Sequence, residues 1–255
     1  MSINIKCNDH IYQDIETVLL NVDGTLLNYN ELWLKQIGYL AQRLAEMHSE
    51  TRGELFRIRA MLTKVLGVDP ETEEIDFTGP FFSCDESQIF MAIGSILYIN
   101  NVSWQKTFES IEKIVDEMKK ELDITAYTSV YADSLEFLEY FTKLVKVITF
   151  SRRSFEDTSK LLKHFNLCQM IEKHCDLSLK VGNTSSGFIE NLCIEHHLTP
   201  EKTLLIADSL NDLSINENIS LKRLAINRNL ADNSYYKNFH LQQVIKNFKD
   251  VEEAV

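Results

Sequence analysis

Four short groups of residues along the chain carry side chains that could together bind a phosphate group. They are the turn Asp23-Gly24 in NVDGT, Thr149 in ITF, Lys180 in LSLKVGN, and Asp208 with Asp212 in IADSLND. Taken singly, each has an ordinary explanation, because Asp-Gly pairs form turns, threonine ends many strands and a lone lysine is usually solvated. Taken together, a hydroxyl donor and a cation suit phosphoryl oxygens, and two nearby carboxylates suit a hard cation such as magnesium.

Four apolar segments would bring these groups to one edge of a sheet. Continuous runs rich in valine, isoleucine and leucine are typical of parallel strands that are covered on both faces. Such runs occupy residues 17–22, 145–150, 203–207 and 224–227. A helical pattern that opens with Ser154 and Asp157 follows the second run. The alternation predicts an α/β fold with a doubly wound, Rossmann-like parallel sheet, whose ligands bind at the carboxyl ends of the strands.

Residues 28–131 show helical periodicity in place of strand-like runs. Apolar residues recur at helical spacing in four successive segments, namely Trp33, Ile37, Leu40 and Leu44; Leu55, Ile58, Leu62 and Val65; Ile89, Ile93, Ile96 and Leu97; and Phe108, Ile111, Val115, Met118 and Leu122, with Ser103 as a candidate N-cap. We therefore expect an α/β core domain of residues 1–27 and 132–255 and an inserted all-helical cap domain of residues 28–131. Because the insertion follows the first strand directly, we expect it above the ligand-binding end of the sheet.

Composition narrows the classes of partner. A net charge of −12 over 255 residues argues against nucleic acid or an anionic membrane as the main partner, because both would be repelled. The five cysteines are odd in number and form no CxxC pair, so neither a disulfide framework nor a zinc site is indicated. The longest apolar run, residues 89–99, is much shorter than the roughly 20 residues that span a bilayer. These features predict a cytoplasmic protein.

The four groups, in this order, resemble the motifs of the haloacid dehalogenase-like superfamily. The resemblance rests on Asn21-Val22-Asp23-Gly24-Thr25, Thr149, Lys180 and Asp208-Ser209-Leu210-Asn211-Asp212, and spans residues 17–27 and about 132–230. The insertion matches the family only in being helical and in lying where the family often carries a cap. The family's dehalogenases lack an acidic residue at the position of Asp23, since a halide needs no proton. The resemblance therefore implies a magnesium-dependent phosphomonoester hydrolase.

The resemblance also implies a role for each site residue. The residue at position 21 would attack phosphorus to form an aspartyl-phosphate, and Asp23 would act as general acid and base. Thr149 and Lys180 would hold the phosphoryl oxygens, in a pocket that includes Gly24, Thr25 and Phe150. Magnesium would be bound by Asn21, Asp23 and Asp208, with Asp212 supporting them.

Asn21 departs from the family's pattern, which has an aspartate there. An amide oxygen is neutral and a poor nucleophile, so turnover is expected to fall on the order of 10⁴ to 10⁶ fold. The amide carbonyl could still bind magnesium more weakly, and the loss of a negative charge reduces repulsion of a phosphate dianion. The chain as written is therefore expected to bind a small phosphorylated metabolite but barely to hydrolyse it.

Several alternatives stay open from the sequence. Asn21 could be an introduced or recent change in a phosphatase, or it could belong to a natural pseudophosphatase that acts as a phospho-ligand or protein-binding module. Direct activation of water by Asp23 is a third route. Arg152 and Arg153 could contact a second anionic group or form a solvated turn. The sequence also leaves open whether the protein forms a homodimer.

Overall fold

The chain divides into two compact units. The computed structural model describes residues 2–84, 86–177, 188–214, 219–230, 233–237, 241 and 243–254. One unit contains Met1–Tyr29 and Thr128–Val255, and the other contains Asn30–Tyr127. Lys180, a predicted phosphate ligand, lies outside the described residues.

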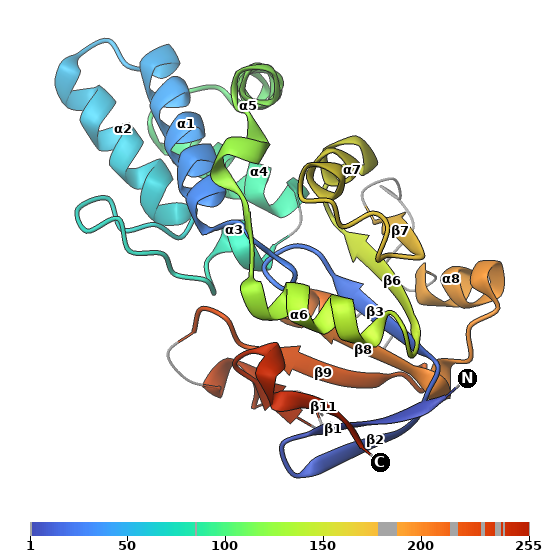
Figure 1. Cartoon of the computed structure of the whole chain (residues 1–255). Coiled ribbons are helices and arrows are strands. Elements are labelled where there is room, and N and C mark those ends of the chain that lie inside the picture. The colour runs from blue at the N-terminus through green and yellow to red at the C-terminus, as the bar shows by residue number, and fades with distance from the viewer. Residues whose placement is uncertain are drawn as a thin grey trace. The chain divides into compact units, whose positions relative to one another are not determined.

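The first unit is built on a six-stranded parallel sheet, seen with its flanking helices in Figure 1. Its strand order is β10-β9-β8-β3-β6-β7. In chain order the strands are β3 (Thr17–Asn21), β6 (Lys146–Ser151), β7 (Lys173–Asp176), β8 (Thr203–Ala207), β9 (Lys222–Ile226) and β10 (Gln243–Ile245). Every residue of β3 and β8 is buried, as continuous apolar runs require. The predicted doubly wound α/β class is confirmed.

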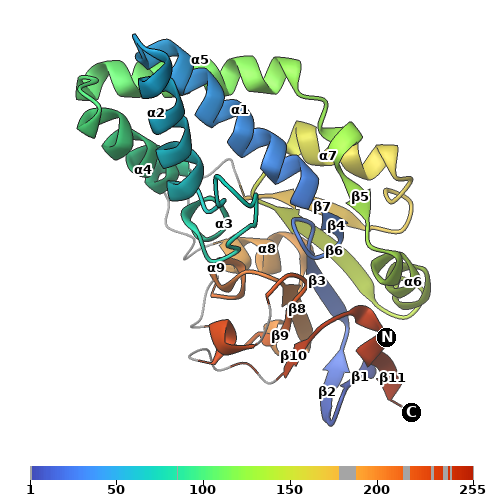
Figure 2. The ribbon, with the colours of Figure 1, turned by 90° about the vertical axis from the view of Figure 1, so that its left-hand side faces the viewer.

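Helices cover both faces of this sheet. They are α6 (Ala132–Phe141), α7 (Phe155–His164), α8 (Phe188–His196) and the short α9 (Leu210–Leu213), with 3₁₀ turns of the same unit at Pro200–Lys202, Ser234–Tyr236 and Phe248–Asp250. Leu192 of α8 packs in one core cluster with Leu19 and Leu205, and α6 lies on the opposite side of the sheet (Figure 2). Ser154 caps α7 by accepting a hydrogen bond from the Asp157 amide at 3.2 Å.

Two small antiparallel sheets complete this unit. The strands β1 (Ile3–Cys7), β2 (His10–Ile15) and β11 (Val251–Ala254) form one sheet in the order β11-β1-β2, and the sequence interpretation did not anticipate it. Asn8 stands in the turn between β1 and β2 with φ 52°, a left-handed value that asparagine tolerates. The strands β4 (Leu27–Asn28) and β5 (Ser129–Val130) pair where the chain leaves and re-enters the unit.

The second unit is helical and has its own core. Its helices are α1 (Asn30–His48), α2 (Arg52–Val65), α3 (Pro80–Ser83), α4 (Glu86–Ile99) and α5 (Trp104–Glu121). Their buried faces meet in a single apolar cluster that includes Leu44, Leu62, Ile93 and Ile111. Ser103 occupies the N-cap position of α5, but its side chain makes no capping hydrogen bond. Among the described residues, no helix combines the length and the apolar character needed to cross a membrane.

Candidate functional site

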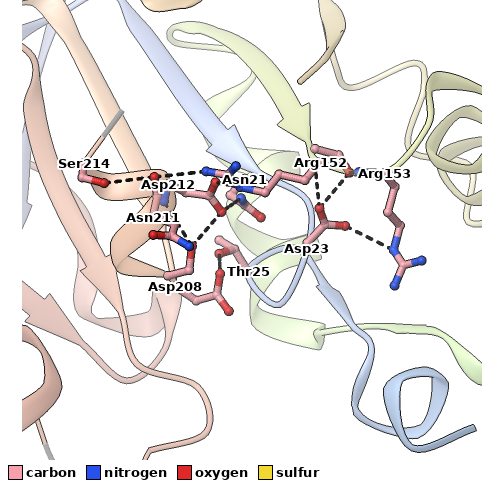
Figure 3. Close-up of polar contacts among 11 residues, drawn as sticks. Asn21, Asp23, Thr25, Arg152, Arg153, Asp208, Asn211, Asp212 and Ser214 are labelled. Atoms are coloured by element: carbon pink, nitrogen blue, oxygen red, sulfur yellow. Dashed lines mark hydrogen bonds and ion pairs between the residues drawn. The ribbon is translucent and has the colours of Figure 1, made fainter. Parts of the chain in front are cut away.

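Six of the predicted site residues gather where the strand order of the sheet reverses. Strand β3 lies in the middle, with β6 on one side and β8 on the other, and all three run parallel. Asn21, the last residue of β3, is paired in register with Phe150 of β6. Asp208 and Asp212 follow the end of β8 directly, and Arg152 follows the end of β6. The carboxyl ends of three neighbouring strands therefore form one polar cluster, which Figure 3 shows in close-up.

A tight turn after β3 brings backbone and side chains into this cluster. Gly24 has φ 69°, a left-handed conformation that glycine adopts without strain. The amides of Leu26 and Leu27 both donate to the carbonyl of Val22, at 3.2 and 3.0 Å, and close the turn. Thr25, fully buried, donates from its hydroxyl to Asp208 Oδ1 at 3.3 Å. The turn is thus joined to the residues that follow β8.

Asn21 is buried against the carboxylate of Asp212. Its exposure is 0%, and its Nδ2 donates to Asp212 Oδ2 at 2.6 Å. The same Oδ2 accepts a hydrogen bond from Ser209 Oγ at 2.8 Å, while Asp212 Oδ1 accepts one from Arg152 Nε at 2.7 Å. Asn21 Oδ1 is buried and has no hydrogen-bond partner among the described residues. Both oxygens of Asp212 are therefore engaged by donors of the chain itself.

Asp23 is held by the residues that end and follow β6. Its Oδ2 accepts hydrogen bonds from Ser151 Oγ at 2.8 Å and from the Arg152 amide at 3.1 Å. Arg153 Nε lies 3.5 Å from Asp23 Oδ1, and the Arg153 guanidinium stacks 4.5 Å from the centre of the Tyr29 ring. Burial raises the pKa of Asp23 above its ordinary value, and the charge of Arg153 opposes that rise. Asp23 thus sits in a setting that favours a raised pKa, as a general acid requires.

Asp208 is a buried acid of the cluster whose pKa is raised. Burial, followed by the charge of Asp212, raises the pKa of Asp208 to about 8. Its backbone carbonyl accepts a hydrogen bond from the Tyr236 hydroxyl at 2.5 Å. The structure therefore brings together Asn21, Asp23, Gly24, Thr25, Asp208 and Asp212 of the predicted set.

Thr149 does not join this cluster. Its hydroxyl lies 3.1 Å from Nδ1 of His174 on the edge strand β7. Ser151, two residues further along β6, reaches the carboxyl end of the strand and donates to Asp23 instead. The side chain of Phe150 faces the apolar core, and its carbonyl accepts a hydrogen bond from the Val22 amide at 2.9 Å. The sequence interpretation missed Ser151, because strand β6 continues one residue beyond the run 145–150.

The two arginines that follow β6 provide positive charge at the site. From the sequence, Arg152 and Arg153 could equally have formed a solvated turn. In the structure each lies against a carboxylate, Arg152 on Asp212 and Arg153 on Asp23. Within the part of the chain that is described, no three His, Cys, Asp or Glu side chains form a group that could hold a metal ion.

Comparison with known proteins identifies the class of fold. The chain has the fold of haloacid dehalogenase-like proteins. It matches a haloacid dehalogenase-like hydrolase from Streptococcus pneumoniae with a TM-score of 0.63 at 11% identity, covering 92% of this chain and 96% of that one. A HAD phosphatase from Thermococcus onnurineus matches with a TM-score of 0.59 at 17% identity, with coverages of 92% and 95%.

A third solved structure, a HAD-superfamily hydrolase of subfamily IA from Geobacter sulfurreducens, matches with a TM-score of 0.56 at 13% identity. The match covers 94% of that chain and 92% of this one. No protein-family model matches the sequence, and no curated protein matches it significantly. Identities this low establish the fold alone, so the chemistry has to be argued from the site.

Proposed function

We propose that the protein binds a small phosphorylated metabolite in a phosphatase-type site whose hydrolytic step is blocked at Asn21. The observation that carries this proposal is the position of Asn21, which ends the central strand and lies fully buried beside Asp212. A carboxylate there would be placed to attack a phosphoryl group at the carboxyl edge of the sheet. The neutral amide is a poor nucleophile, so the protein would bind its ligand but barely hydrolyse it.

Phosphate binding is proposed to involve donors at the end of β6. Ser151 donates to Asp23 and is placed where Thr149 was expected to act, so we assign the hydroxyl contact to Ser151. Arg152 supplies a guanidinium, which forms bidentate contacts with phosphate oxygens well. Asp23, with its raised pKa, would serve as general acid in a form that carries Asp at position 21. The contribution of Lys180 stays a prediction.

Magnesium stays a prediction, and the residues of this chain fit it poorly. Asn21 offers one neutral amide oxygen where the family's site has a carboxylate. Both oxygens of Asp212 already accept hydrogen bonds from Asn21, Ser209 and Arg152. Asp208 is then the one remaining carboxylate next to β8, and its Oδ1 already accepts a hydrogen bond from the Thr25 hydroxyl at 3.3 Å. We therefore derive no step through a metal ion for the chain as given.

The cellular setting and the partner class are part of the same proposal. All five cysteines are free thiols, which supports a reducing compartment such as the cytoplasm. The net charge of −12 supports a small metabolite over a polyanion as ligand. The helical unit is proposed as the cap that selects this ligand.

The proposal is tested by measuring phosphate release from a panel of phosphorylated metabolites, with magnesium present. The chain as given should release almost none, whereas Asn21→Asp should hydrolyse at least one member of the panel on the order of 10⁴ times faster. The reason is that the carboxylate restores a nucleophile at the end of β3.

Asn101→Asp is the matched control, because it adds the same charge at an exposed position of the helical unit. It should stay as inactive as the parent chain. Absence of activity in Asn21→Asp across the panel would overturn the phosphatase-type assignment, and full activity of the parent chain would overturn the block at Asn21.

A further inference from the structure

The carboxylate of Asp212 is satisfied by the chain without any cation from solution. Its Oδ2 accepts from Asn21 Nδ2 and Ser209 Oγ, and its Oδ1 accepts from Arg152 Nε, all at 2.8 Å or less. An aspartate at position 21 could not donate in this way. Two carboxylates would then face each other at hydrogen-bond distance and would need a cation between them. The amide of Asn21 removes that need, because it is itself a hydrogen-bond donor to Asp212.

The two arginines after β6 supply the charge that a divalent cation would bring. Arg152 forms an ion pair with Asp212 at 2.7 Å, and Arg153 approaches Asp23 to 3.5 Å. The Arg153 side chain is only 16% exposed and is fixed against the Tyr29 ring, so its charge is a permanent part of the site. The guanidinium groups of these two consecutive arginines therefore lie against two of the three site carboxylates, Arg152 against Asp212 and Arg153 against Asp23.

Arg152 has the exposure and the free donor that ligand binding needs. Its side chain is 43% exposed, although its Nε is bonded to Asp212 and one terminal nitrogen donates to the Asn211 carbonyl at 3.1 Å. The second terminal nitrogen has no hydrogen-bond partner among the described residues. Figure 3 shows this side chain extending from the end of β6 across Asn21 toward Asp212. A guanidinium anchored on one edge presents its other edge to an anion.

We infer that this site binds the phosphoryl group of its ligand without a divalent cation, with Arg152 providing the positive charge that contacts it. This inference rests on the proposed phosphate-binding function and adds its cation requirement. In this site, Asn21 and Arg152 together contact Asp212 in place of a metal ion.

The test is calorimetric titration of inorganic phosphate into the intact chain, once with EDTA and once with excess magnesium. We expect the same Kd, within about twofold, in both conditions. Arg152→Gln should weaken binding about 10 to 100 fold in both, the usual effect of removing a charged hydrogen bond. Asn21→Asp should make binding at least about tenfold tighter with magnesium than with EDTA, because it restores the facing carboxylates. Magnesium alone should give no binding heat with the parent chain.

Arg43→Gln is the matched control, since Arg43 is an exposed ion-paired arginine of α1 in the helical unit. It should leave the Kd unchanged. Binding of phosphate only in the presence of magnesium would overturn the inference while leaving the proposed function standing. Binding in neither condition would overturn both. An unchanged Kd for folded Arg152→Gln would overturn the role of Arg152. If that variant does not fold, the comparison of EDTA with magnesium on the parent chain still decides whether phosphate binding requires a divalent cation.

Discussion

An amide in place of a carboxylate at position 21 changes what its neighbours can contact. Asp212 accepts a short hydrogen bond from Asn21, which an aspartate could not give. Asp23 keeps two hydrogen-bond donors and the charge of Arg153 around it, so the proposed general acid is intact although the proposed nucleophile is absent. In the proposed function, these contacts serve ligand binding, while the covalent step lacks its nucleophile.

Ser151 and Thr149 provide a contrast between two hydroxyls on one strand. Ser151→Ala should weaken binding of inorganic phosphate about 5 to 30 fold, because it removes a donor at the carboxyl end of β6. Thr149→Val should leave the Kd within about twofold, since its hydroxyl contacts His174 and not the cluster. Titration calorimetry measures both. The opposite ranking would show that Thr149, as first expected from the sequence, is the phosphate-binding hydroxyl.

Among the elements, strands β6 and β7 are joined by a contact that involves a titratable side chain. His174 on β7 lies against the Thr149 hydroxyl and stacks on the Phe155 ring at 5.8 Å. Burial lowers the pKa of His174 to about 4, below its ordinary value of 6.5. The edge strand therefore carries a histidine that is neutral while the protein is folded.

This histidine should make the fold sensitive to acid. Below about pH 6.5 the unfolded chain binds a proton at His174 that the folded chain does not bind, so the free energy of unfolding falls as the pH falls toward about 4. Between pH 7 and pH 5 the loss should be about 2 kcal/mol. Urea unfolding of the parent chain and of His174→Gln at both pH values measures it. An equal loss in the two proteins would contradict this prediction.

The elements differ in how far the sequence predicts them. Strands β3, β6, β8 and β9 are predictable because each contains a run of mainly apolar residues that is buried on both faces. The edge strand β7 has the sequence KHCD and a single buried residue, so periodicity gives no signal for it. Strand β1 pairs with β2 in a local hairpin and with β11 from the other end of the chain, and no local pattern reveals the second pairing.

At the scale of the whole molecule, the site depends on contacts between distant segments. Ser151 and Asp23 are 128 residues apart, and Asn21 and Asp212 are 191 apart. The sequence predicts that the carboxyl ends of parallel strands meet, but the order of the strands decides which side chains touch. Motif spacing therefore predicted Asn21, Asp23, Asp208 and Asp212 as site residues and the sequence offered Arg152 as a candidate, whereas the proposed role of Ser151 needed the structure. The helical unit, with its own core, stays a proposed cap.

The proposed block at Asn21 predicts that residue 21 carries a phosphoryl group only when it is an aspartate. The measurement is intact-mass spectrometry after incubation with acetyl phosphate and magnesium, followed by peptide mapping. Asn21→Asp combined with Asp23→Asn, which slows release of the phosphoryl group, should carry a phosphoryl adduct on residue 21. The parent chain and Asp23→Asn alone should carry none. An adduct on the parent chain, or its absence at position 21 of a folded double variant, would contradict the account.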